Sequence, residues 1–291
     1  MENEEIKPVH RGLKKGLYVI PTAFTAANIA MGFIAVLYSI RGYHLTFSDP
    51  AAAASYFNYA SIAIVLAILF DVLDGRVARM TKTATEIGVQ FDSLADVLTF
   101  GIAPIALMYS WAIGTSFAET SSEYGLGIFL LFMYLMCGTF RLARFNLQAT
   151  RPRVLMEGTP KVDKKNFVGL PIPPAAGLIA AIVHFAPMPL IANGDAGARY
   201  YTYLVMTLIT VLSVLMVSTV KYSSLKTVGV GRRNLYLVLV IAAIGMLIYL
   251  YSKYVLLILY ASYVAHGLIW YAISALRSKY KPAAEQSESL S

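Results

Sequence analysis

The composition of this 291-residue chain excludes an ordinary soluble globular protein. Hydrophobic residues make up 58% of it and charged residues only 14%, whereas soluble domains carry about 25% charged residues. Its apolar runs are continuous and not alternating, which argues against a spanning β-barrel. The single cysteine, Cys137, excludes a disulfide framework and a thiolate metal site. We therefore expect an integral membrane protein built from helices.

Eight apolar runs are long enough to cross a bilayer, which takes about 20 helical residues. The predicted spans lie at about 17–40, 53–73, 90–114, 124–143, 169–192, 200–220, 234–251 and 254–275. The fold class predicted from them is all-α, a polytopic membrane helical bundle of about eight transmembrane helices. Its polar active-site cavity is expected to face the cytoplasm.

The net charge of +8 is explained by membrane topology. If the N-terminus is cytoplasmic, all but three of the 24 Lys and Arg residues fall on the inside, the exceptions being Arg41, Arg199 and Lys253. Basic loops on that side would also attract acidic lipids and phosphates. We therefore expect a multi-pass protein of the inner (plasma) membrane, with both termini and the active site cytoplasmic, and no nucleic-acid partner.

The chain divides into one membrane domain and its flanks. Residues 1–16 are expected to form a cytoplasmic surface segment, and residues 17–226 the main membrane domain. Residues 227–276 would add a C-terminal pair of transmembrane helices. The polar residues 277–291 would form a disordered cytoplasmic tail.

One stretch, "DVLDGRVARMTKTATEIGVQFDSLAD" at residues 71–96, places four carboxylates at the ends of two predicted spans. Asp71 and Asp74 are three residues apart and share a helical face. Asp92 and Asp96 are four apart and form a second stripe. Two helices joined by a turn can therefore point all four carboxylates into one space.

Four carboxylates at membrane depth repel one another and are costly to bury, so a counter-charge is expected. Oxygen ligands without Cys or His favour hard divalent cations such as Mg²⁺ or Mn²⁺. Two such ions, about 3.5–4 Å apart, can clamp a pyrophosphate. Small residues at Gly75, Ala78 and Gly88 would let a nucleotide approach the backbone, and Arg79 could pair with a phosphate. The alternative is that these are charges at membrane ends without a function.

The whole pattern, D-x2-D-G-x2-A-R-x8-G-x3-D-x3-D, resembles the signature of the CDP-alcohol phosphatidyltransferase family. The resemblance implies a site for two metal ions and for CDP-diacylglycerol, with Asp96 as the base that deprotonates the acceptor alcohol. The implied metal ligands are Asp71, Asp74, Asp92 and Asp96. The residues implied to surround CDP-diacylglycerol are Asn28, Gly75, Ala78, Arg79 and Gly88.

Segments beside this signature resemble the phosphatidylserine synthase branch of the family. They are "IPTAFTAANIAMG" (20–32), "FDSLADVLTFGIAP" (91–104), "CGTFRLARFN" (137–146), "FVGLPIPPAAG" (167–177) and "LMVSTVKYSSLK" (215–226). The resemblance implies transfer of the phosphatidyl group from CDP-diacylglycerol to the hydroxyl of L-serine, giving phosphatidylserine and CMP. Thr22 stands where that branch is expected to have Asn.

Three polar residues at the end of the fourth predicted span are candidates for binding serine or phosphate. Arg141 and Arg144 suit bidentate pairing with a carboxylate or phosphate, but could instead be topological anchors. Asn146 could bind an ammonium group or cap the helix. His184, in an apolar run, is expected to be a hydrogen-bonded histidine of the bundle and not a ligand.

Two alternatives stay open at the level of sequence. The acceptor could be another alcohol, such as inositol or glycerol 3-phosphate. From a different class, an ion-coupled transporter could use paired Asp residues, although such sites usually lie near mid-membrane between repeated halves. Membrane lipids and the two substrates are the expected partners, and a homodimer is expected by analogy with the family.

Overall fold

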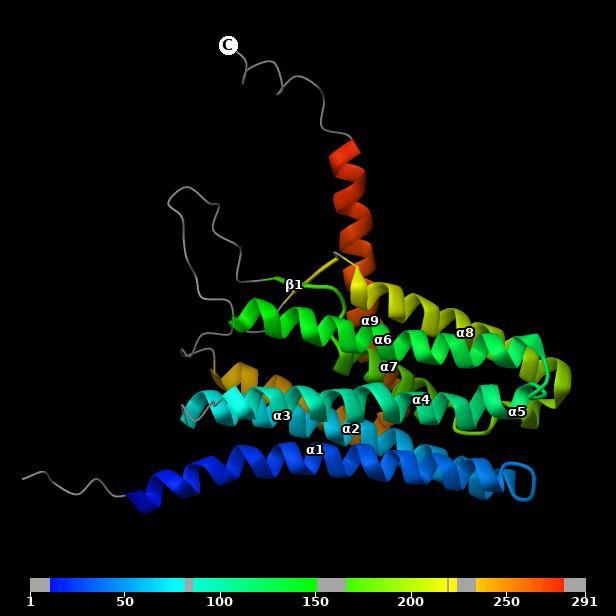
Figure 1. Cartoon of the computed structure of the whole chain (residues 1–291), viewed down its shortest axis with the longest axis horizontal. Helices are drawn as coiled ribbons and strands as arrows, with labels where there is room; N and C mark the ends of the chain where they lie inside the picture. The colour runs from blue at the N-terminus through cyan, green and yellow to red at the C-terminus, as the bar shows by residue number, and fades with distance from the viewer. Residues whose placement is uncertain (1–10, 82–85, 151–165, 219, 224–233, 280–291) are drawn as a thin grey trace, which may run out of the picture.

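The computed structural model describes residues 11–81, 86–150, 166–218, 220–223 and 234–279, which form a helical bundle (Figure 1). Its α-helices are α1 (Arg11–Leu45), α2 (Pro50–Thr81), α3 (Glu86–Asp96), α4 (Ala103–Met108), α5 (Gly114–Ser116), α6 (Ser122–Thr150), α7 (Ile172–Phe185), α8 (Gly194–Val217) and α9 (Asn234–Lys279). The other elements are π-helical segments η1 (Val97–Ile102) and η2 (Tyr109–Ile113), the 3₁₀ turn η3 (Leu190–Asn193), and strands β1 (Asn166–Val168) and β2 (Lys221–Ser223), which pair antiparallel.

Six of the described helices are long and apolar enough to cross a membrane, and α7 is a shorter apolar helix. The six candidate spans are Thr22–Leu45, Pro50–Val77, Gly88–Ser116, Ser122–Leu147, Leu190–Val217 and Gly245–Ile269. The prediction of an all-α polytopic membrane bundle is thereby confirmed. The count of eight spans stays a prediction. Residues predicted as spans seven and eight lie in α9, which consists of two helices that meet at a kink, where the backbone of Tyr251 leaves helical geometry (φ −135°, ψ 42°).

Several long helices run side by side along the bundle (Figure 1). The turns that join α1 to α2 and α5 to α6 lie at one end, on the right of the view, and the end of α2 and the start of α3 lie at the other. Residues 11–16 of the predicted surface segment belong to α1. The rest of that segment, residues 151–165 and most of the predicted tail lie outside the described residues.

The helix formed by α3, η1, α4, η2 and α5 is the most buried of the six candidate spans. In its most apolar window 61% of the residues are buried, compared with 28% for α1 and 11% for α9. This central helix packs against α1, α2, α6 and α7. Polar residues on it are therefore held by neighbours on several sides.

The central helix widens into the π-helical turn η1 directly after Asp96. Side chains bridge this turn to two neighbouring helices. Thr99 Oγ1 donates a hydrogen bond to the carbonyl oxygen of Asn28 on α1 (3.3 Å), and the Tyr134 hydroxyl of α6 donates to the carbonyl oxygen of Phe100 (3.2 Å). Such bonds can satisfy carbonyls where the regular helical pattern changes. The sequence predicts only a regular helix over 90–114.

Close approach of α1 to this turn depends on Gly32. A Cβ atom added there would lie 2.6 Å from Thr99 Oγ1 and 2.9 Å from Thr99 Cα. We expect Gly32→Ala to lower the free energy of unfolding by about 1–3 kcal/mol, because overpacking forces the helices apart. The matched control is Gly125→Ala on α6, where a Cβ meets nothing within 4 Å. Thermal unfolding in detergent measures both. Equal melting temperatures for the two variants would contradict this account of the contact.

Helix α9 packs on α7 and is tied to the bundle through His184. This buried side chain makes one hydrogen bond at each ring nitrogen. Nδ1 lies 2.6 Å from Asn58 Oδ1 on α2, and Nε2 lies 2.9 Å from Ser252 Oγ on α9. The prediction of a hydrogen-bonded bundle histidine is thus confirmed. Farther along the same contact, Tyr260 lies so close to Gly177 that a Cβ there would overlap its ring.

Candidate active site

Four carboxylates come from the adjoining ends of α2 and α3. Asp71 and Asp74 lie on one face of α2, and Asp92 and Asp96 lie one turn apart on α3. The connection between the two helices, residues 82–85, lies outside the described residues. Three- and four-residue helical spacing on each helix directs the acidic side chains to a common space.

Asp71, Asp92 and Asp96 each offer a carboxylate oxygen, and these three atoms lie within 4.8 Å of one another. Asp74 is buried and accepts a hydrogen bond from the Thr25 hydroxyl of α1. Its charge lies close enough to repel those of Asp71 and Asp92. The structure therefore brings together all four predicted metal ligands, three of them in a single tight group.

The site has far more negative than positive charge. Asp96 is repelled by the other three carboxylates and attracted by the buried Arg141 of α6. Among the described side chains, the charge of Arg141 does not balance those of the four carboxylates in a low-dielectric environment, where unpaired charges are costly. An arrangement of this kind requires protons, cations or a polar ligand to complete it.

Orphaned polar atoms lie beside the carboxylates. Within the described part of the chain, Asp96 Oδ1 and both side-chain amide atoms of Asn28 are buried without a hydrogen-bond partner. Asn28 is near Asp96 because its carbonyl accepts from Thr99, which follows Asp96 by three residues. Buried polar groups are nearly always paired in native proteins, so unpaired ones point to an ion or ligand. The all-oxygen donor set fits a hard divalent cation.

The three residues predicted to bind serine or phosphate contact different parts of the structure. Arg141 acts on Asp96 and stacks over the ring of Phe145 at 5.7 Å. Asn146 Nδ2 donates to Ser93 Oγ at 2.8 Å, which places it beside Asp92. Arg144 instead reaches the end of α8, where its Nη1 lies 3.5 Å from the Val217 carbonyl oxygen. Of the three, Arg141 is therefore the one that interacts with a carboxylate of the site, and Asn146 contacts the helix that carries Asp92 and Asp96.

The small residues predicted to admit a nucleotide continue the two acidic helices. Gly75 follows Asp74 directly and is half-buried, and Gly88 is exposed one turn before Asp92. Ala78 and Arg79 lie on the next turn of α2, but their side chains lie outside the described part. By backbone position, these four residues flank the acidic group on α2 and α3.

Two contacts to the site were not predicted from the sequence. Thr25 hydrogen-bonds Asp74 from α1, and Tyr263 of α9 interacts electrostatically with Arg141. The spacing of Thr25 and Asn28, three residues apart in the first apolar run, places both on one polar face of that helix, but it does not indicate which helix this face meets. No local spacing could have indicated the second, because Tyr263 lies more than a hundred residues from Arg141.

Fold and site together define a class: a polytopic helical membrane protein with a partly buried carboxylate site between two successive helices. Comparison with known proteins identifies a family within this class. The CDP-alcohol phosphatidyltransferase family matches residues 18–215. The chain therefore belongs to the CDP-alcohol phosphatidyltransferase family, as its acidic signature indicated.

Several curated proteins of similar sequence are named as serine O-phosphatidyltransferases or as an archaetidylserine synthase. The chain is 31% identical over 254 residues to the CDP-diacylglycerol–serine O-phosphatidyltransferase of Helicobacter pylori, covering 87% of this chain and 91% of that protein. It is 32% identical over 213 residues to the archaetidylserine synthase of Methanothermobacter thermautotrophicus, covering 72% of each. It is also 33% identical over 129 residues to the CDP-diacylglycerol–serine O-phosphatidyltransferase of Saccharomyces cerevisiae, covering 44% of this chain and 42% of that protein.

Proposed function

We propose that this protein transfers the phosphatidyl group from CDP-diacylglycerol to the hydroxyl of L-serine, forming phosphatidylserine and CMP. The observation that carries the proposal is the partly buried group of Asp71, Asp92 and Asp96 with an unpaired, buried Asp96 oxygen, in a member of this family. The names of the relatives support serine as the acceptor.

The four carboxylates, Asp71, Asp74, Asp92 and Asp96, are the proposed ligands of two divalent ions, Mg²⁺ or Mn²⁺. When bound, such ions neutralise the pyrophosphate and stabilise the leaving phosphate oxygens. The chain's own contribution is to hold Asp74 in place through Thr25 and to keep Asp92 and Asp96 on the well-buried central helix. Residues proposed to surround the CDP moiety are Asn28, Gly75, Ala78, Arg79 and Gly88.

Asp96 is proposed as the general base. Its carboxylate takes the proton of the serine hydroxyl while the serine oxygen bonds to the β-phosphorus. The bond from that phosphorus to the CMP oxygen breaks, and CMP leaves with the electron pair. The buried Arg141 keeps Asp96 in place by charge attraction, and single displacement requires no covalent enzyme intermediate.

Serine must be held with its hydroxyl toward this base. Arg141 and Asn146 are proposed to bind the carboxylate of serine or a lipid phosphate, since Arg141 interacts with Asp96 and Asn146 contacts Ser93 on the same helix. Arg144 is retained as a weaker candidate because it already contacts the Val217 carbonyl. We propose that the active site and both termini lie on the cytoplasmic side of the inner membrane, in agreement with the distribution of Lys and Arg. A homodimer is proposed by analogy with the family.

A panel of acceptors tests the choice of alcohol. With purified protein, CDP-diacylglycerol and Mn²⁺, we expect radiolabelled serine to enter lipid at least about 100-fold faster than inositol or glycerol 3-phosphate, because a site that binds polar groups rejects ligands lacking them. CMP release should require both the divalent ion and serine. Faster incorporation of another alcohol would show that serine is not the preferred acceptor. Absence of CMP release with every acceptor would favour the ion-coupled transporter instead.

A further inference from the structure

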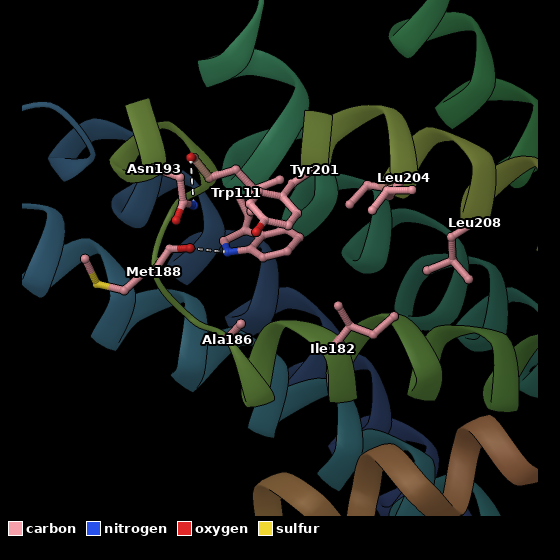
Figure 2. A pocket seen from close by; sticks show the side chains of 10 residues that line it. Trp111, Ile182, Ala186, Met188, Asn193, Tyr201, Leu204 and Leu208 are labelled. Carbon is pink, nitrogen blue, oxygen red and sulfur yellow. Dashed lines mark hydrogen bonds between the residues drawn. The ribbon is translucent and has the colours of Figure 1, made fainter. Parts of the chain in front are cut away.

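An apolar pocket of about 560 Å³ lies between α7, η3 and α8, and Trp111 of η2 also lines it (Figure 2). Ile182 of α7 faces Leu204 and Leu208 of α8 across it (Figure 2). Its volume is within the range of about 300–1,000 Å³ that is typical of small-molecule sites. The pocket is therefore large enough for a substantial ligand, and nothing in the proposed transfer reaction uses it.

Two polar side chains of the pocket wall, Trp111 and Asn193, donate hydrogen bonds within the protein. The Trp111 indole N–H donates to the carbonyl oxygen of Met188 at 2.8 Å, and Asn193 Nδ2 donates to the carbonyl oxygen of Leu190 at 3.1 Å (Figure 2). The first bond holds the turn between α7 and η3 against the central helix, and the second lies within η3. The rest of the pocket wall is mostly apolar side chains. An apolar cavity of this kind binds apolar molecules in preference to water.

This pocket is separate from the carboxylate site. Trp111 follows Asp96 by 15 residues on the continuous central helix, which corresponds to about 22 Å along the axis. The pyrophosphate and the acceptor alcohol of the proposed reaction therefore lie a long way from it. A ligand in this pocket would contact the same helix that carries Asp92 and Asp96, but at its other end.

The surroundings of the pocket indicate what fills it. Its α8 wall belongs to a candidate membrane span, and the side chains at its rim, Met188, Tyr201 and Leu204, are each about half exposed. On a membrane span such exposed side chains face lipid, so hydrocarbon is the chemistry present in excess. We propose that the pocket binds one acyl chain of a phospholipid of the surrounding bilayer, as a site distinct from that of the lipid substrate.

Photo-crosslinking tests this site without reference to turnover. The full chain is placed in phosphatidylcholine vesicles containing a phosphatidylglycerol probe with a diazirine near the end of one acyl chain. After irradiation, peptides are mapped by mass spectrometry. We expect labelling on α7 and α8 around Ile182 and Leu208. Leu208→Trp, which fills the pocket, should reduce this labelling by about tenfold, the effect of excluding roughly two methylene groups.

The matched control is Val214→Trp, a similar change on α8 at an exposed position that does not line the pocket. It should keep the labelling of the unaltered protein, and both variants should keep its melting temperature within a few degrees. Equal labelling in Leu208→Trp and Val214→Trp would overturn the site. If unlabelled CDP-diacylglycerol reduced the labelling, the pocket would bind an acyl chain of the lipid substrate, and the proposal of a bilayer phospholipid would be wrong. If Leu208→Trp, but not Val214→Trp, abolished a dimer and left the labelling unchanged, the pocket would be part of an interface with a second copy of the chain, and the lipid proposal would be wrong. None of these outcomes depends on whether serine is the acceptor.

Discussion

Asp96→Asn is expected to reduce the rate of CMP release by about 10²–10⁴-fold at saturating Mn²⁺ and serine, the usual contribution of a general base. The amide keeps the size of the side chain and an oxygen that can still contact a cation, but it cannot accept the hydroxyl proton. The loss should therefore appear in kcat, while the KM for CDP-diacylglycerol changes little. Initial-rate kinetics on the purified protein measure both quantities.

Asp195→Asn provides the control for this variant. Asp195 is an exposed carboxylate in the first turn of α8, outside the acidic group, so its removal should leave the rate unchanged. Near-full turnover of Asp96→Asn with metal bound would show that another group, or solvent, takes the proton. The metal would then remain a sufficient explanation for the position of Asp96.

The second large effect concerns the repulsion among the carboxylates. Asp71→Asn replaces one of the three carboxylates whose oxygens lie within 4.8 Å of one another by a neutral amide, which is a weaker metal ligand. Without divalent ions, we expect this variant to melt about 2–4 °C higher than the unaltered protein, which corresponds to relief of about 1 kcal/mol of repulsion. With Mn²⁺ the order should reverse, because the unaltered protein gains binding free energy that the variant has largely lost.

Thermal unfolding in EDTA and in a Mn²⁺ series measures both halves of this prediction. The CMP-release rate of Asp71→Asn should fall by at least about 10²-fold over the same series, since a missing ligand weakens transition-state charge stabilisation. Asp195→Asn again serves as control and should follow the unaltered protein at every metal concentration. If Mn²⁺ stabilises Asp71→Asn as strongly as the unaltered protein, Asp71 is not a metal ligand.

Much of the site could be predicted because its pattern is local. Asp71 and Asp74 are separated by one turn of helix, as are Asp92 and Asp96, and helical periodicity alone places each pair on one face. The apolar runs on both sides set the helices in a membrane, since about 20 apolar residues are needed to span it. The acidic composition of the group then indicates a divalent cation without any knowledge of how the helices pack.

Other parts of the site depend on segments far apart in the chain. Thr25 reaches Asp74 and Asn28 lies by the turn after Asp96 only because α1 crosses the central helix at Gly32. Arg141 comes to the same place from α6. Side-chain spacing within one helix carries no information on which other helix will meet it, so these neighbours could be suggested from the sequence only by resemblance to the family.

The sequence by itself determined the membrane-spanning helical class and the faces that carry the four carboxylates, because hydropathy and helical spacing are properties of single segments. Only the tertiary structure decided the π-helical turn after Asp96, the break in α9 at Tyr251, and the pairing of His184 with Asn58 and Ser252. Each of these arises where helices from distant parts of the chain pack together. Close packing between elements selects such local departures from regular geometry, and the pattern of one element does not encode them.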